Sequence, residues 1–99
     1  MTVRHVVSWQ LAASDPVVRA EHADAIVRGL TSLVGVVDEI RALHAGVDIG
    51  GGGNWDVVLV ADFDDLDAVG RYQVHPSHQE VAAFIRSVVA QRMAVDFEV

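Results

Sequence analysis

Cysteine and lysine are both absent from this chain of 99 residues. Without cysteine the chain has no disulfide, no thiolate nucleophile and no iron–sulfur or cysteine-type zinc site. All seven basic residues are arginines, against fourteen Asp and Glu, and the formal net charge is −7. Nucleic acids and anionic membranes both select cationic surfaces, so this balance argues against either as a partner.

Long apolar runs are missing too. No stretch of about eighteen apolar residues occurs, and the first residues lack the apolar core of a signal peptide, so we expect a cytoplasmic protein. The length predicts a single domain over residues 1–99. Hydrophobic residues make up 52% of the chain and charged residues only 21%. So few charges cover a small domain poorly, which predicts that a partner buries part of its apolar surface.

The hydrophobic periodicity predicts the order strand, helix, strand, strand, helix, strand. We expect strands over residues 3–11, 36–47, 55–63 and 92–99. The first helix opens at Asp15-Pro16 and ends near Gly35. The second helical region begins with the acidic run at residue 64, breaks at His75-Pro76 and then continues to about residue 89. This is the βαββαβ order of a ferredoxin-like α+β fold with an antiparallel four-stranded sheet.

The third predicted strand is apolar on both of its faces. If Val57 and Leu59 face the helices, the opposite face of the sheet is also apolar. The residues expected on that open face are Val6, Val58 and Val60. The helices bury one face of such a sheet, and the other apolar face also has to be buried. We therefore predict a homodimer joined sheet to sheet, burying about 800 Å² on each partner.

Five histidines and one tyrosine carry the candidate chemistry. On the helix side of the sheet, His5 faces a pocket that Tyr72 and His78 flank. A neutral imidazole transfers protons near neutral pH, and a phenol donates a hydrogen bond to a carbonyl or enolate oxygen. Asp96, on the last strand, is placed to orient one imidazole. The side chains expected to line the pocket are Val7, Trp9, Leu59 and His75, and the group suits proton abstraction beside a carbonyl.

Each of these residues also has a purely structural interpretation. His75 before a proline is typical of a turn or a cap, His78 in a first helical turn bonds nearby backbone, and Tyr72 fits a core position. His75 and His78 lack the carboxylate or HExxH context of a metal site. The glycine run at residues 50–53 reads as a hairpin loop and is not followed by the Gly-Lys-Ser/Thr of a phosphate loop. We therefore predict no metal and no cofactor.

Four segments together resemble a known family. They are the early His5 with its alternating valines, Trp55-Asp56 leading into Val-Val-Leu-Val-Ala-Asp-Phe, the run Tyr72-Gln73-Val74-His75-Pro76-Ser77-His78, and Asp96-Phe97. This pattern resembles the stress-responsive dimeric A/B barrel (Dabb) family over nearly the whole chain. The resemblance implies ferredoxin-like subunits that pair their sheets into a dimeric α/β barrel.

One plant protein of that family, olivetolic acid cyclase, closes a ring on a linear polyketide thioester without metal or organic cofactor. By the resemblance, His78 is the general base and Tyr72 the donor that orients the substrate oxygen, with His5 and Asp96 in supporting positions. Trp9 is expected to occupy much of the pocket, which disfavours a polyketide.

Three functions follow from these expectations. The first is a protein that binds a small carbonyl compound and acts as a cofactor-independent cyclase or lyase. The alternatives are a noncatalytic stress-responsive or ligand-binding dimer and a protein like the small monooxygenases. A helix-side cavity of about 300 Å³ or more favours a ligand.

Overall fold

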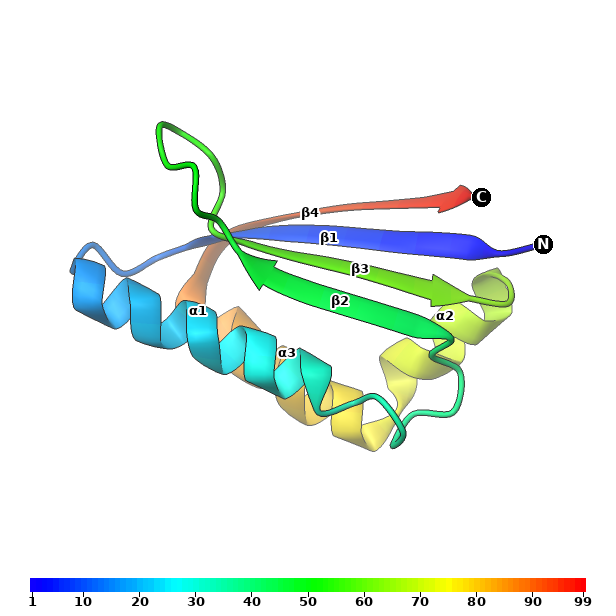
Figure 1. Ribbon diagram of the computed structural model, residues 1–99. Coiled ribbons are helices and arrows are strands. Elements are labelled where there is room, and N and C mark those ends of the chain that lie inside the picture. Colours follow the sequence, from blue (N-terminus) through cyan, green and yellow to red (C-terminus); the bar gives the residue numbers. More distant parts are fainter.

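A computed structural model describes residues 1–99 as a four-stranded antiparallel sheet with three helices on one face (Figure 1). Along the chain the elements are β1 (Val3–Leu11), α1 (Pro16–Thr31), β2 (Ala42–Val47), β3 (Val57–Phe63), α2 (Leu66–Val74), α3 (Pro76–Val88) and β4 (Val89–Glu98). The strands lie in the order β2-β3-β1-β4, so the predicted ferredoxin-like fold is confirmed. None of the helices has the length and apolar character needed to cross a membrane.

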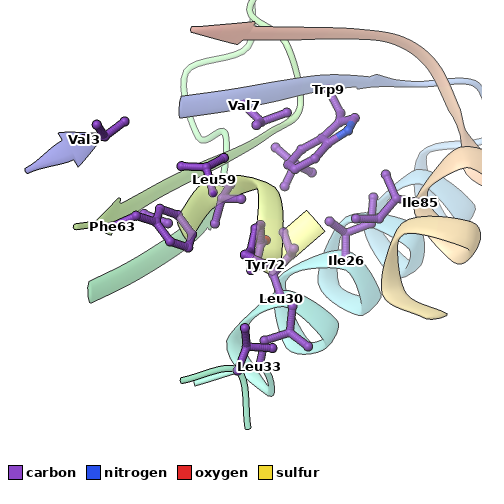
Figure 2. Close-up of a cluster of buried hydrophobic side chains, with 14 of the residues drawn as sticks. Val3, Val7, Trp9, Ile26, Leu30, Leu33, Leu59, Phe63, Tyr72 and Ile85 are labelled. Atoms are coloured by element: carbon purple, nitrogen blue, oxygen red, sulfur yellow. The ribbon is translucent and has the colours of Figure 1, made fainter. Parts of the chain in front are cut away.

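The central strand β1 carries the alternation that the sequence predicted. Every second side chain is buried toward the helices, beginning with Val3 and His5, and the residues between them are partly exposed. β1 pairs with β3 so that Val7 lies opposite Leu59, and both side chains enter the core (Figure 2). Successive side chains of a strand point to opposite faces, so alternate residues of β1 lie on the helix side and contribute to the buried core.

The helix starts follow from local chemistry. The carboxylate of Asp15 accepts the backbone N–H groups of Val17 and Val18 at 2.8 and 3.3 Å, and Pro16 begins α1. Asp65 caps α2 in the same way, accepting from Ala68 N at 2.8 Å. These caps satisfy N–H groups that have no partner within the helix, which fixes where each helix begins.

The segment between α1 and β2 differs from the prediction. The expected strand over residues 36–47 begins only at Ala42, and α1 ends at Thr31 rather than near Gly35. Residues 32–41 form turns in which Leu33 and Val37 are fully buried, and Gly35 has a φ of 82°. Buried apolar residues in a packed turn resemble a strand in sequence, which explains the error.

The junction between α3 and β4 also differs from the prediction. β4 begins at Val89, three residues before the predicted start, so Val89 belongs to the strand and not to the preceding helix. On α3 only Ile85 is buried, and the aromatic side chain of Phe84 is 39% exposed. Phe84 instead lies edge-on against His22 of α1, with ring centroids 6.4 Å apart.

No helix covers the opposite face of the sheet. Val6, Val58 and Val60 lie there as predicted, and β4 adds further apolar side chains, because each of them pairs with an outward residue of β1. The β4 residues on this open face are Met93, Val95 and Phe97, each between 44% and 53% exposed. The open face is therefore an apolar surface that spans β3, β1 and β4.

Candidate functional site

A cavity of about 620 Å³ lies between the inner face of the sheet and the helices. Val7 and Trp9 of β1 and Leu59 of β3 form its sheet side, as predicted. Trp9 extends from β1 toward Tyr72 and Ile85, which come from α2 and α3 (Figure 2). Trp9 was expected to occupy much of this space, yet the remaining volume exceeds the roughly 300 Å³ at which small-molecule sites begin.

Tyr72 forms part of the cavity wall from α2. Its ring is fully buried, 4.9 Å from the Phe63 ring and 4.3 Å from the His78 ring between centroids. Its hydroxyl is buried and has no hydrogen-bond partner. Burial raises the pKa of the phenol to about 12, with Arg92 opposing this rise. The phenol therefore stays protonated at neutral pH and holds an unused hydrogen-bond donor.

His78 reaches the cavity from the first turn of α3. Its Nδ1 lies 3.0 Å from the carbonyl oxygen of Gln73. A carbonyl only accepts, so Nδ1 carries the proton and the Nε2 lone pair is left without a partner in the protein. Burial, chiefly, lowers the pKa of His78, opposed by the bond to Gln73. At neutral pH the imidazole is thus uncharged and able to take a proton at Nε2.

His5 and Asp96 lie directly opposite each other on β1 and β4. Nδ1 of His5 donates a hydrogen bond to Oδ1 of Asp96 in a close contact. A carboxylate that accepts from an imidazole in this way fixes the orientation of the ring. His5 lines the cavity and its ring centroid is 6.2 Å from that of Tyr72. Asp96 does not line the cavity, and its contact with the cavity wall is through His5.

His75 does not line the cavity, contrary to the prediction. It separates α2 from α3 with φ −61° and ψ 134°, the extended conformation that the following proline imposes. Its Nδ1 accepts the backbone N–H of Ser77 at 3.1 Å, so it caps α3. The structural interpretation of this histidine is therefore correct.

Sequence reasoning missed four polar residues of the cavity. They are Gln73, Gln79, Arg86 and Arg92. Helical spacing could have found Arg86, since it follows His78 by two turns on α3. Arg92 lies opposite Trp9 on β4, and only the register of β4 brings it to the cavity. No three His, Asp or Glu side chains come close enough together to hold a metal ion.

The chain belongs to the Dabb family, the stress responsive A/B barrel domain, which it matches over residues 3–99. It is similar to the stress-response A/B barrel domain-containing protein HS1 of Arabidopsis thaliana, with 24% identity over 97% of this chain and 88% of the relative. A dimeric ferredoxin-like protein from Bacteroides fragilis has a TM-score of 0.92 and 26% identity over 99% of this chain and 96% of that one. A dimeric ferredoxin-like protein from Thermobifida fusca has a TM-score of 0.84 and 30% identity, with coverages of 100% and 92%.

Two enzymes share the fold at 15% identity. The hydroxynitrile lyase of Passiflora edulis has a TM-score of 0.80 and covers 97% of this chain and 91% of its own. SnoaB, a cofactor-independent oxygenase from Streptomyces nogalater, has a TM-score of 0.76, with coverages of 99% and 92%. At this identity the likeness concerns the fold alone.

Proposed function

We propose that this Dabb protein binds a small carbonyl compound in its cavity and catalyses cofactor-independent proton transfer on the carbon beside the carbonyl. The observation that carries the proposal is the hydrogen bond from His78 Nδ1 to Gln73, which leaves the second ring nitrogen free in a cavity wall shared with Tyr72. The reaction class is a lyase or cyclase step that starts from an enolate.

His78 is the general base in this proposal. Its Nε2 takes a proton from the α-carbon, and the electrons of the broken C–H bond form the enolate. The imidazolium then returns the proton to carbon or to a leaving group. General base catalysis of this kind contributes about 10²–10⁴ in rate.

Tyr72 supplies the hydrogen bond that stabilises the enolate oxygen. A phenol with a pKa of about 12 is protonated throughout the neutral range, so it donates rather than accepts. Because the hydroxyl is buried, a ligand oxygen reaches it only after neighbouring side chains shift. Once made, this bond is stronger than one in water, because the surroundings are apolar.

His5 and Asp96 are positioning residues in this scheme. The Asp96 carboxylate holds the His5 imidazole in one orientation against the cavity. A fixed imidazole beside the reacting group limits how the substrate lies. The same fold occurs in a hydroxynitrile lyase and in a cofactor-independent oxygenase.

We also propose that the chain forms a homodimer through the open face of its sheet. Proteins of the same fold that are dimeric support the formation of a dimer. The open face offers an apolar surface across three strands, which is costly to leave in water.

Exchange of α-protons tests the proposed chemistry. Acetophenone is incubated with the protein in deuterium oxide, and loss of the methyl proton signal is followed by NMR. We expect exchange above the buffer rate, and its loss in His78→Gln. The control is His22→Gln, because His22 packs against Phe84 and does not line the cavity.

Equal exchange in His78→Gln and the wild type would remove the histidine from the mechanism. Binding of acetophenone without any exchange would instead support the noncatalytic ligand-binding alternative.

A further inference from the structure

Five of the seven arginines are paired with carboxylates. The partners are Arg4 with Asp62, Arg19 with Asp56, Arg28 with Asp24, Arg41 with Asp64 and Arg71 with Glu39, at distances of 2.6 to 3.3 Å. Arg86 and Arg92 are the two that form neither an ion pair nor a side-chain hydrogen bond, although the chain has fourteen acidic residues. Both of them line the cavity.

The cavity has no acidic residue in its wall. Besides the hydroxyl of Tyr72, its other polar side chains are two histidines and two glutamines, and the nearby Asp96 already accepts from His5. Two arginines from different elements, α3 and β4, therefore line the same cavity, and no carboxylate in its wall balances their charge. In a protein with a net charge of −7, both unpaired arginines lie at this cavity, and guanidinium groups are well suited to bind carboxylates.

We propose that the ligand of this cavity is an anion, a carbonyl compound that carries a carboxylate on an apolar body, and that Arg86 and Arg92 bind the carboxylate at the rim. The inference rests on the proposed function and names its substrate class. The apolar body lies against Trp9 and the aliphatic wall, while the carbonyl end reaches Tyr72 and His78.

Both arginines also act on the base. Their positive charges help to lower the pKa of His78, together with its burial. A bound carboxylate offsets these charges, which eases the formation of the imidazolium when His78 takes a proton. The same two side chains therefore bind the anion and influence the pKa of His78.

The test compares two probes that differ in charge, 4-oxo-4-phenylbutanoate and its neutral amide. Binding is followed by the indole N–H NMR signal of Trp9 in a Trp55→Phe background, which leaves Trp9 as the single tryptophan. We expect the carboxylate to bind about ten-fold more tightly than the amide, and this preference to shrink as ionic strength rises.

Arg86→Gln and Arg92→Gln should each weaken binding of the carboxylate by up to about five-fold, as expected for partly exposed ion pairs, and the double variant should remove the preference. Arg28→Gln is the control, because it makes the same change of charge on α1, where Arg28 pairs with Asp24 away from this cavity. Equal affinity for the two probes, or unchanged carboxylate binding in the double variant, overturns the anion inference and leaves the cavity as a ligand site. Binding of neither probe overturns the proposed function as well.

Discussion

Removing the hydroxyl of Tyr72 should stabilise the protein while it impairs its chemistry. The group is buried without a hydrogen-bond partner, and Tyr72 is the only tyrosine of the chain. Leaving a buried polar group unpaired costs about 1–3 kcal/mol. Tyr72→Phe keeps the ring contacts with Phe63 and His78 and removes only this cost.

The oxygen also leaves a small gap, which offsets part of the gain. We therefore expect a net stabilisation of about 1 kcal/mol, which for a domain of this size raises Tm by about 4–8 °C. The assay is thermal unfolding followed by circular dichroism, at one fixed protein concentration. In parallel, Tyr72→Phe should lower the rate of α-proton exchange by about ten- to a hundred-fold, because the enolate oxygen loses its donor.

The two measurements separate the possible roles of Tyr72. A loss of stability of about 1 kcal/mol or more, seen as a lower Tm, would refute the reasoning, since it would mean that the hydroxyl has a stabilising partner in the folded state. A raised Tm with unchanged exchange would confirm the packing argument and remove Tyr72 from the chemistry.

Three further predictions concern the dimer and the two titrating groups. Val95→Asp on the open face should weaken dimerisation at least about 100-fold in analytical ultracentrifugation, because an unpaired buried carboxylate costs several kcal/mol. Val36→Asp is its matched control, since Val36 is 52% exposed and Val95 53%; equal weakening in both would contradict the sheet-to-sheet pairing. The folded pKa of His78 lies below its usual value, so protonation favours the unfolded chain. The free energy of unfolding should therefore fall as pH drops below about 6.5, by more in the wild type than in His78→Gln, and identical slopes would speak against a half-buried neutral imidazole. In the folded protein the phenol of Tyr72 should ionise near its pKa of about 12, as followed by ultraviolet absorbance. Stability should be lost as pH rises above about 10, because the tyrosine of the unfolded chain ionises first. Ionisation of the folded protein near pH 10 would show instead that the hydroxyl is accessible to water.

Local patterns predicted those parts of the fold that depend on neighbours in the chain. The alternation in β1 showed which side of the strand faces the helices, and Asp15-Pro16 marked the start of α1. Tyr72 and His78 could be predicted as neighbours because they are only six residues apart, on either side of the break at Pro76. The sequence predicted that Asp96 orients one imidazole without showing which, and the pairing of β1 with β4 brings it to His5.

The remaining features depend on packing and register. Leu33 and Val37 are buried in a turn, and no local signal separates such a turn from a strand. Arg92 reaches the cavity because the register of β4 places it opposite Trp9, and no local signal shows which residue of β1 lies opposite it. The absence of carboxylates around Arg86 and Arg92 is likewise a property of the folded molecule, since acidic residues are plentiful in the sequence.

The state of His78 in solution tests the central claim most directly. Heteronuclear NMR of the imidazole nitrogens reports which nitrogen carries the proton, its pKa, and whether a ligand contacts the ring. The account predicts that Nδ1 is protonated at neutral pH, that the pKa lies below 6.5, and that saturating 4-oxo-4-phenylbutanoate shifts the Nε2 signal of His78 and not that of His22. A proton on Nε2 in the neutral ring, or an Nε2 signal that the bound ligand leaves unchanged, would contradict it.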